Sequence, residues 1–338
     1  MYPDFIGIGA QKAGTTWLHH NLQAHPGIWM PKEKELHYFD EKIKQEGGPL
    51  QRLRGDRPLD KRWRRQAKSR LRRMPRGPFA QDLGWDLRYF LGRPSDRWYA
   101  SLFEAGKGKV TGEATPDYAI LSRDDVAHVH EIMPDAKIIF MMRNPLERPW
   151  SAMDMRTRIR GESIEEITDR KFYRRFDARG SQLRTRYLRT LDNWGAFYPA
   201  DRIFVGFLED VHFFPDRLLG DLYEFVGVDP NFRPPGADRR VHSGKQETIP
   251  TRFAVHLARS YHEELKTLHE RLGGHASFWL FCAERLIEDA PPEEHVSYPL
   301  YASPLWEEWA GGAGPGPGTR PSYGSGTFAS FRAARPGP

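Results

Sequence analysis

A loop near the N-terminus carries the residues whose types and spacing most clearly allow chemistry. Residues 9–18 read Gly-Ala-Gln-Lys-Ala-Gly-Thr-Thr-Trp-Leu, and they follow the apolar run Phe-Ile-Gly-Ile at 5–8. This order predicts a strand, a tight loop and a helix. In such a unit the backbone N–H groups and the helix N-terminus can bind a phosphate or a similar anion. The alternative is a glycine-containing turn without a ligand.

The lysine of this loop does not stand where ATP-hydrolysing loops have theirs. In the pattern G-x-x-x-x-G-K-[ST] the lysine directly follows the second glycine. Here Thr15 follows Gly14, and Lys12 precedes that glycine. The loop therefore places one cation at its apex and the hydroxyls of Thr15 and Thr16 at the start of the helix. A dinucleotide-binding loop is disfavoured, because Lys12 occupies the place of its third glycine.

A second motif follows the apolar run at 137–142 and reads R-N-P-x-x-R-x-x-S from Arg143 to Ser151. Arg143 is expected at the C-terminal end of a buried parallel strand, where open α/β sheets bind ligands. Ser151 is expected in the first turn of the next helix, where a hydroxyl and unpaired N–H groups can hold a phosphate. The alternative is an arginine that pairs with a carboxylate, with Ser151 as an ordinary helix residue.

Both motifs resemble those of sulfotransferases that use 3′-phosphoadenylyl sulfate (PAPS). The first resembles the loop that binds the 5′-phosphosulfate, and the second resembles the 3′-phosphate motif. The resemblance covers residues 5–272 and implies PAPS as co-substrate. The residues implied to bind it are Gln11, Lys12, Ala13, Gly14, Thr15, Thr16, Trp17, Arg143 and Ser151, with Arg240 and Lys245 from a looser match at 239–245.

The segment from Lys34 to Asp40 resembles the K-E-x-H-F-F-D segment of heparan-sulfate-type sulfotransferases. Transfer to an alcohol requires a base for the hydroxyl proton. The resemblance implies that Glu35 is this base, with His37 and Asp40 supporting it or touching the acceptor, and leaves His37 as the other candidate base. Without the resemblance, the run of charges would read as a solvated loop.

Residues 98–103 and 112–118 match the family more loosely. Ala114 stands where heparan-sulfate-type members often carry a lysine, so the match does not extend to a sulfated-glycan acceptor. The acceptor class stays open between a small molecule, a lipid and a carbohydrate, through a hydroxyl or an amine. The resemblance implies catalysis by Lys12, Glu35 and His37 without a metal, and one cysteine cannot form a zinc–thiolate site.

Two other functions are compatible with parts of the sequence. One is a P-loop nucleotide-dependent kinase, which the position of Lys12 disfavours. The other is a non-catalytic protein that binds anions or nucleic acid through residues 52–76. That segment holds twelve Lys and Arg against two Asp, while the whole chain has a net charge of +6. It is predicted to be helical, exposed and without an apolar face, and to meet an anionic surface or acceptor rather than a stable nucleic-acid partner.

The alternation of strands and helices predicts an α/β fold, a P-loop-like parallel sheet flanked by helices on both faces. Strands are expected at 109–113, 137–143 and 202–207, and helices are expected at 124–133, from 148, and at 181–197, 215–226 and 251–272. We expect one domain at 1–310, with a basic insertion at about 41–96 and a disordered, Gly/Pro-rich tail at 311–338.

The compartment is expected to be the cytoplasm. Cys282 is the only cysteine, so no internal disulfide can form, which suits a reducing environment. No apolar run approaches the length of a membrane span, and no leader is recognisable. The oligomeric state stays open.

Overall fold

The computed structural model describes residues 1–312 except 41–52, 57, 74–82, 165 and 237–246. Most of the predicted tail at 311–338 therefore lies outside the described residues. Residues 311 and 312 themselves end a helix, α16 (Pro304–Gly312).

The predicted parallel sheet is confirmed. It has five strands in the order β2-β3-β1-β4-β5, and every pair in it is parallel. The strands are β1 (Phe5–Gly9), β2 (Ile28–Trp29), β3 (Val110–Ala114), β4 (Lys137–Met142) and β5 (Ile203–Phe207). The central strands β1 and β4 are almost wholly buried, as expected for a sheet covered on both faces.

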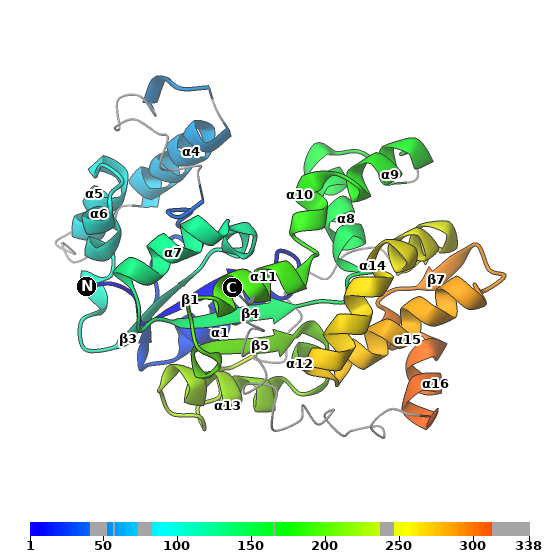
Figure 1. Cartoon of the computed structure of the whole chain (residues 1–338). Helices are drawn as coiled ribbons and strands as arrows, with labels where there is room; N and C mark the ends of the chain where they lie inside the picture. The colour runs from blue at the N-terminus through cyan, green and yellow to red at the C-terminus, as the bar shows by residue number, and fades with distance from the viewer. Residues whose placement is uncertain (41–52, 57, 74–82, 165, 237–246, 313–338) are drawn as a thin grey trace, which may run out of the picture.

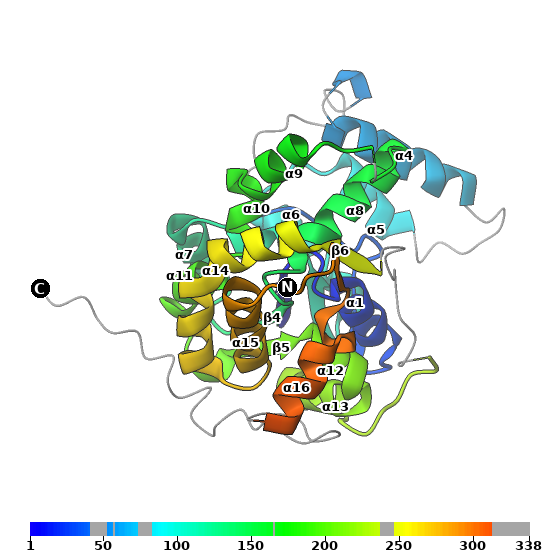
Figure 2. The same cartoon turned by 90° about the vertical axis from the view of Figure 1, so that its right-hand side faces the viewer.

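Helices cover both faces of this sheet (Figures 1 and 2). One face carries α7 (Arg123–Ile132) and α11 (Tyr187–Gly195), and the other carries α1 (Thr15–Ala24) and α13 (Pro215–Val226). On the second face the Tyr223 hydroxyl donates a hydrogen bond to the Asn21 carbonyl at 3.0 Å, which joins α13 to α1. The sheet and these two layers hold the loops at its C-terminal edge.

The predicted helices agree closely with the observed ones, with one exception. The stretch 181–197 is two helices, α10 (Arg179–Leu183) and α11, rather than one. At the break the Arg184 side chain binds Asp117, and the Thr185 hydroxyl accepts a hydrogen bond from Arg148. The spacing of apolar residues did not predict this break in the helix, and at the break these two side chains make contacts with distant parts of the chain.

In its described part the basic insertion contains α4 (Pro58–Arg73) and α5 (Leu83–Leu91), and α6 (Asp96–Ser101) begins where it ends. The predicted helicity of the basic segment is confirmed over its described part. One apolar side chain of the segment is nonetheless buried: Trp63 packs edge-on against Phe90 at a centroid distance of 5.7 Å. The exposed side of α4 presents Lys61, Arg65 and Lys68.

The C-terminal third contains the predicted long helix α14 (Thr251–Leu272) and elements that the sequence did not predict. Helix α15 (His275–Glu288) packs on α14, and β6 (Thr248–Pro250) pairs antiparallel with β7 (His295–Ser297). The remaining helices are α8 (Arg148–Arg160), α9 (Asp169–Phe176) and α12 (Leu208–Phe213). Within the described ranges, no helix combines the length and the apolar character that crossing a bilayer requires.

Candidate active site

The loop between β1 and α1 has the cradle shape that its sequence predicted. Gly14 has φ +81°, a conformation that favours glycine, and a Cβ added there would lie 3.1 Å from Leu208 Cδ1. The Ala13 N–H donates to the Ala10 carbonyl at 3.1 Å, and Trp17 is buried in the core. The loop is thus closed on itself, and it ends where α1 begins, at a helix terminus whose first N–H groups have no partner within the helix.

Lys12 forms the apex of this loop, with a left-handed backbone at φ +76°. Over the described residues, its ammonium group makes no hydrogen bond and no ion pair. Burial, followed by the nearby cations Arg143, Arg158 and Lys34, lowers the pKa of Lys12 to about 8 against the opposing effect of Asp154. Several cations therefore converge beside the loop, which is an arrangement that an anion would stabilise.

Arg143 follows β4 directly and connects three parts of the chain. Its Nε and Nη2 donate to Glu147 Oε2 at 3.0 and 2.8 Å, and Nη2 also donates to the Tyr298 hydroxyl at 2.6 Å. Its Nη1 donates to the Lys12 carbonyl at 3.3 Å. The carboxylate pairing that the sequence left open as an alternative is therefore present, and the same guanidinium borders the lysine loop.

Neighbouring strands bring these groups together. Strands β3, β1 and β4 are adjacent and parallel, so their C-terminal ends meet at one edge of the sheet. The loops that follow these ends contain Thr115, Lys12 and Arg143 respectively. Ligands of open α/β sheets bind at this edge.

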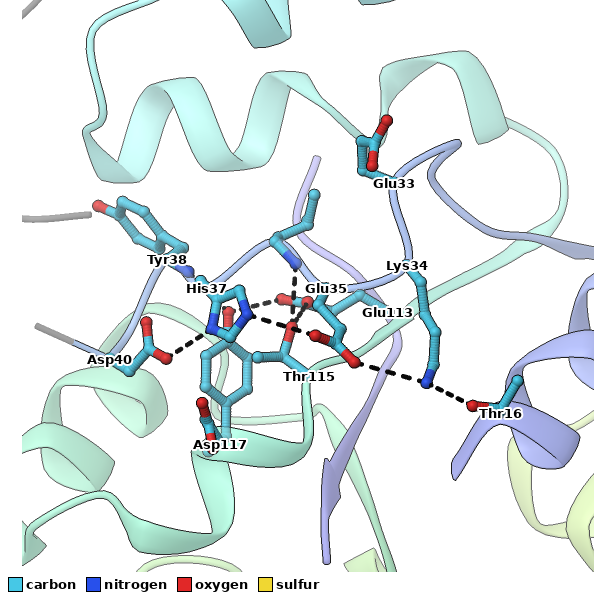
Figure 3. A network of polar contacts seen from close by, with 12 residues as sticks. Thr16, Glu33, Lys34, Glu35, His37, Tyr38, Asp40, Glu113, Thr115 and Asp117 are labelled. Carbon is cyan, nitrogen blue, oxygen red and sulfur yellow. Dashed lines mark hydrogen bonds and ion pairs between the residues drawn. The ribbon is translucent and has the colours of Figure 1, made fainter. Parts of the chain in front are cut away.

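The Lys34–Asp40 segment lies beside the lysine loop and forms a chain of polar contacts (Figure 3). Lys34 Nζ donates to Thr16 Oγ1 at 3.1 Å and lies 3.5 Å from Glu35 Oε1. Glu35 Oε2 lies 3.4 Å from His37 Nε2, and His37 Nδ1 lies 2.6 Å from Asp40 Oδ2. His37 and Asp40 are buried, whereas the Glu35 side chain is 28% exposed. Of the two acids in this series of contacts, Glu35 and Asp40, Glu35 is the one that solvent, or an acceptor, can reach.

A buried carboxylate under the segment fixes its position. Glu113, at the end of β3, accepts hydrogen bonds from Tyr99 and Tyr118 through Oε1 and from Thr115 through Oε2. Complete burial raises the pKa of Glu113 against these three hydroxyl donors. In turn, the Leu36 N–H donates to Thr115 Oγ1 at 3.0 Å. The sheet edge thereby positions the backbone on either side of Glu35 and His37.

His37, Asp40 and Asp117 also form a group whose potential metal-binding atoms all lie within 4.8 Å of one another. In the structure, however, the Asp117 carboxylate accepts hydrogen bonds from Arg184 Nε and Nη2 at 3.0 and 2.8 Å. Asp40 is similarly engaged by His37. The expectation that catalysis needs no metal stays a prediction, and these contacts show how the cluster is held by the protein's own groups.

Most of the residues predicted from the sequence gather at this edge, from Gln11 to Trp17, at Glu35 and His37, and at Arg143 and Ser151. Arg240 and Lys245 lie outside the described residues. Sequence reasoning missed Lys34 as a site residue, although it stands inside the motif that contains Glu35. It also missed Tyr298, which meets Arg143 across 155 positions of the chain and carries no local pattern that marks it.

Comparisons with known proteins agree with the site. The model of the sulfotransferase family matches residues 3–232. The chain is 28% identical over 149 residues to the membrane-associated sulfotransferase kil1 of Dictyostelium discoideum, a match that covers 44% of this chain and 22% of that protein. This chain thus spans about a fifth of the length of that relative.

The fold is also similar to a solved structure, a sulfotransferase from Alicyclobacillus acidocaldarius. The two share 21% sequence identity at a TM-score of 0.54, and the alignment covers 80% of this chain and 95% of the other. At this identity the likeness concerns the fold alone. The family match, however, extends over more than half of the chain, and the resemblance noted in its motifs is confirmed: this protein belongs to the sulfotransferase family.

Proposed function

We propose that this protein transfers a sulfuryl group from PAPS to a hydroxyl or amine of a small-molecule, lipid or carbohydrate acceptor. The observation that carries the proposal is the position of Lys34. Its ammonium group touches Thr16 of the anion-binding loop and lies 3.5 Å from Glu35, the candidate base. The Lys34 side chain therefore connects the loop that would bind the anionic end of PAPS with Glu35, which would accept the proton.

The residues present suit the charge of PAPS. PAPS supplies an activated sulfuryl group and a bisphosphorylated nucleotide, and both parts are strongly anionic. Gly14 and the N-terminus of α1 offer N–H donors, and Lys12 offers a cation that has no ion-pair partner among the described residues. Arg143 and Ser151 would hold the 3′-phosphate, with Arg240 and Lys245 as further candidate contacts.

In the proposed mechanism Glu35 accepts the acceptor's proton as the acceptor oxygen forms its bond to sulfur. The bond from sulfur to the 5′-phosphate oxygen breaks, so the products are a sulfate ester and adenosine 3′,5′-bisphosphate. Lys12 stabilises the negative charge that develops on the leaving phosphate, by analogy with phosphoryl transfer. The ammonium group of Lys34 lies between Thr16 of the loop and Glu35, so it can stabilise negative charge at either position during the transfer. His37, held by Asp40, orients Glu35 or replaces it as the base.

The test is sulfur-labelled PAPS incubated with the purified protein and fractionated acceptor extracts. We expect label in a new product, formed without added divalent metal. Metal-dependent turnover of ATP with no transfer from PAPS would favour the kinase alternative instead. The cytoplasmic location expected from the sequence belongs to this proposal and is tested by cell fractionation.

A second property rests on the exposed face of α4. Lys61, Arg65 and Lys68 point into solvent there, while Gln66 of the same helix donates a hydrogen bond to Glu33 at 2.7 Å, next to the candidate base segment. We propose that this face attracts an anionic acceptor or an anionic lipid surface toward the site. The word "membrane-associated" in the name of the Dictyostelium relative is consistent with the lipid alternative. Measuring binding to vesicles with and without anionic lipid distinguishes attraction to a lipid surface from attraction to an anionic acceptor.

A further inference from the structure

Helices α8, α9 and α10 rise above the sheet (Figure 1), and four arginines from this region line a pocket. We call it the arginine pocket and define it by Arg148 and Arg156 of α8, Arg175 of α9 and Arg184 just after α10. The space in it that a water-sized molecule can occupy is about 10 Å³, which is room for a single water molecule, and the Arg156 side chain that borders it is exposed.

Arg148 is the deepest of the four, with an exposed fraction of 1%. Its Nε donates to Thr185 Oγ1 at 2.6 Å, and its Nη2 donates to the Ser181 carbonyl and hydroxyl at 3.3 and 3.0 Å. All these acceptors are neutral, and no carboxylate forms an ion pair with Arg148 in the described part of the chain. Burial lowers the pKa of Arg148 to about 10, and Arg184 and Arg156 contribute to that lowering. A buried cation of this kind is costly unless an anion lies near it.

Of the other three arginines, Arg184 is paired with Asp117, whereas Arg156 and Arg175 carry charge with little compensation. Arg156 makes no hydrogen bond or ion pair with any described residue, and burial together with Arg184 and Arg175 lowers its pKa. Arg175 donates to Met153 Sδ at 2.9 Å, and its nearest carboxylate, Glu162, is 4.0 Å away.

Acidic residues of the same region are paired elsewhere. Asp154 pairs with Arg158, and Asp169 pairs with Arg252. Asp177 pairs with His256 on α14. The pocket therefore keeps an excess of positive charge.

The arginine pocket borders the end of the active site where the base lies. Arg184 binds Asp117, and a carboxylate oxygen of Asp117 lies within 4.8 Å of ring and carboxylate atoms of His37 and Asp40. A molecule with an anionic group in the pocket could thus extend past Asp117 toward Glu35.

We propose that the arginine pocket binds an anionic group of the acceptor, a carboxylate, sulfate or phosphate, and so holds the acceptor's hydroxyl at Glu35. This inference rests on the proposed sulfuryl transfer and narrows its acceptor class to anionic molecules. Arg156 supplies a guanidinium without a protein partner, and Arg148 supplies a buried positive field that water screens poorly.

The first experiment measures binding without turnover. The wild-type protein is saturated with adenosine 3′,5′-bisphosphate, so that the donor's anion sites are filled, and thermal unfolding is followed with inorganic phosphate, sulfate or acetate against chloride at equal ionic strength. We expect one of these anions to raise the midpoint, because a ligand that binds the folded state stabilises it. Arg156→Ala should lose the shift. Arg160→Ala, which removes a charge one turn further along α8, should keep it.

The comparison of anions distinguishes the sources of the group: acetate reports a carboxylate, whereas phosphate and sulfate report their esters. An equal shift in wild type and Arg156→Ala, or no shift with any of the three anions, would overturn the proposal. Because Arg156 and Arg160 are both exposed, neither variant threatens the fold. Failure of the bisphosphate to bind would count against the proposed function, and the anion titration on the free protein would still report on the pocket.

The second experiment uses matched pairs of hydroxyl acceptors, with and without an anionic group, in the labelled-PAPS assay. For the anionic member, Arg156→Ala should raise KM about tenfold or more, the effect of losing a hydrogen bond to a charged group. Arg160→Ala should leave KM nearly unchanged, and kcat should be preserved in both. A neutral acceptor that is used as efficiently as its anionic partner would contradict the assignment.

Discussion

Arg143 and Arg148 stand in one motif and are both buried, yet their surroundings differ. Arg143 shares two hydrogen bonds with Glu147 and one with Tyr298, so its charge is balanced within the protein. Arg148 binds only neutral oxygens. We assign Arg143 to the proposed donor end, with Lys12 and Ser151, and Arg148 to the proposed acceptor end, with Glu35 and His37. Arg143 is thus a buried cation that the protein itself pairs with a carboxylate, whereas Arg148 is a buried cation that no carboxylate of the described residues pairs.

The largest expected effect separates chemistry from donor binding. Glu35→Gln keeps the shape of the side chain but cannot accept a proton, so we expect kcat to fall about 10²–10⁴-fold. The dissociation constant of adenosine 3′,5′-bisphosphate, measured by calorimetry, should change little. His37→Ala is the matched comparison. If Glu35→Gln stays fully active and His37→Ala is inactive, the base is His37.

At the donor end, Lys12→Ala should lower kcat about 10²–10³-fold, as expected for the loss of one charged contact to the developing oxyanion. Bisphosphate binding should persist in weakened form, because this contact strengthens mainly in the transition state. Turnover at the wild-type rate would remove Lys12 from the mechanism.

The pH dependence checks the same residue independently. Lys12 is charged below its pKa of about 8 and neutral above it, so bisphosphate affinity should fall as the pH rises through about 8 in the free protein. Lys12→Ala should lack this fall. An affinity that is flat from pH 7 to pH 9 in the wild type would show that the charge of Lys12 does not contribute.

A smaller effect tests which phosphate the donor end reads. Ser151→Ala and Arg143→Ala should weaken binding of the 3′,5′-bisphosphate about tenfold or more, and should leave binding of adenosine 5′-monophosphate nearly unchanged. Ser151→Ala is the cleaner variant, because Arg143→Ala also leaves Glu147 buried without its partner. Equal losses for the two nucleotides would assign both residues to the fold alone.

The smallest effect concerns the exposed face of α4. Replacing Lys61, Arg65 and Lys68 by Gln should raise the KM of an anionic acceptor about two- to fivefold, because exposed charges contribute little each. Added salt should reproduce this effect. An acceptor KM that ignores both salt and the substitutions leaves α4 without a role in recognition.

The donor end was more predictable than the acceptor end, and the reason is local sequence. A strand, a glycine loop and a helix start within a few residues, so the order around Lys12 and Gly14 predicts their geometry. The parallel sheet and most helix boundaries followed from the alternation and spacing of apolar segments in the same way. The arginine pocket and the contact of Tyr298 with Arg143 depend on side chains brought together from distant segments, and no spacing in the chain marks them. The burial of Trp63 was missed because one aromatic residue in a charged helix has no periodic partner.

The hydrogen bond between Tyr298 and Arg143 bears on which fragments of the chain would keep the surroundings of Arg143 intact. The family match ends at residue 232, but Tyr298 binds Arg143, and the Leu300 N–H donates to Glu147 at 2.7 Å. A fragment that stops at 232 would keep every matched residue and still leave Glu147 and Arg143 without two of their hydrogen bonds. The stretch that matches the family model is therefore shorter than the set of residues that holds Arg143 and Glu147 in place, and residues beyond 232 take a direct part in that arrangement.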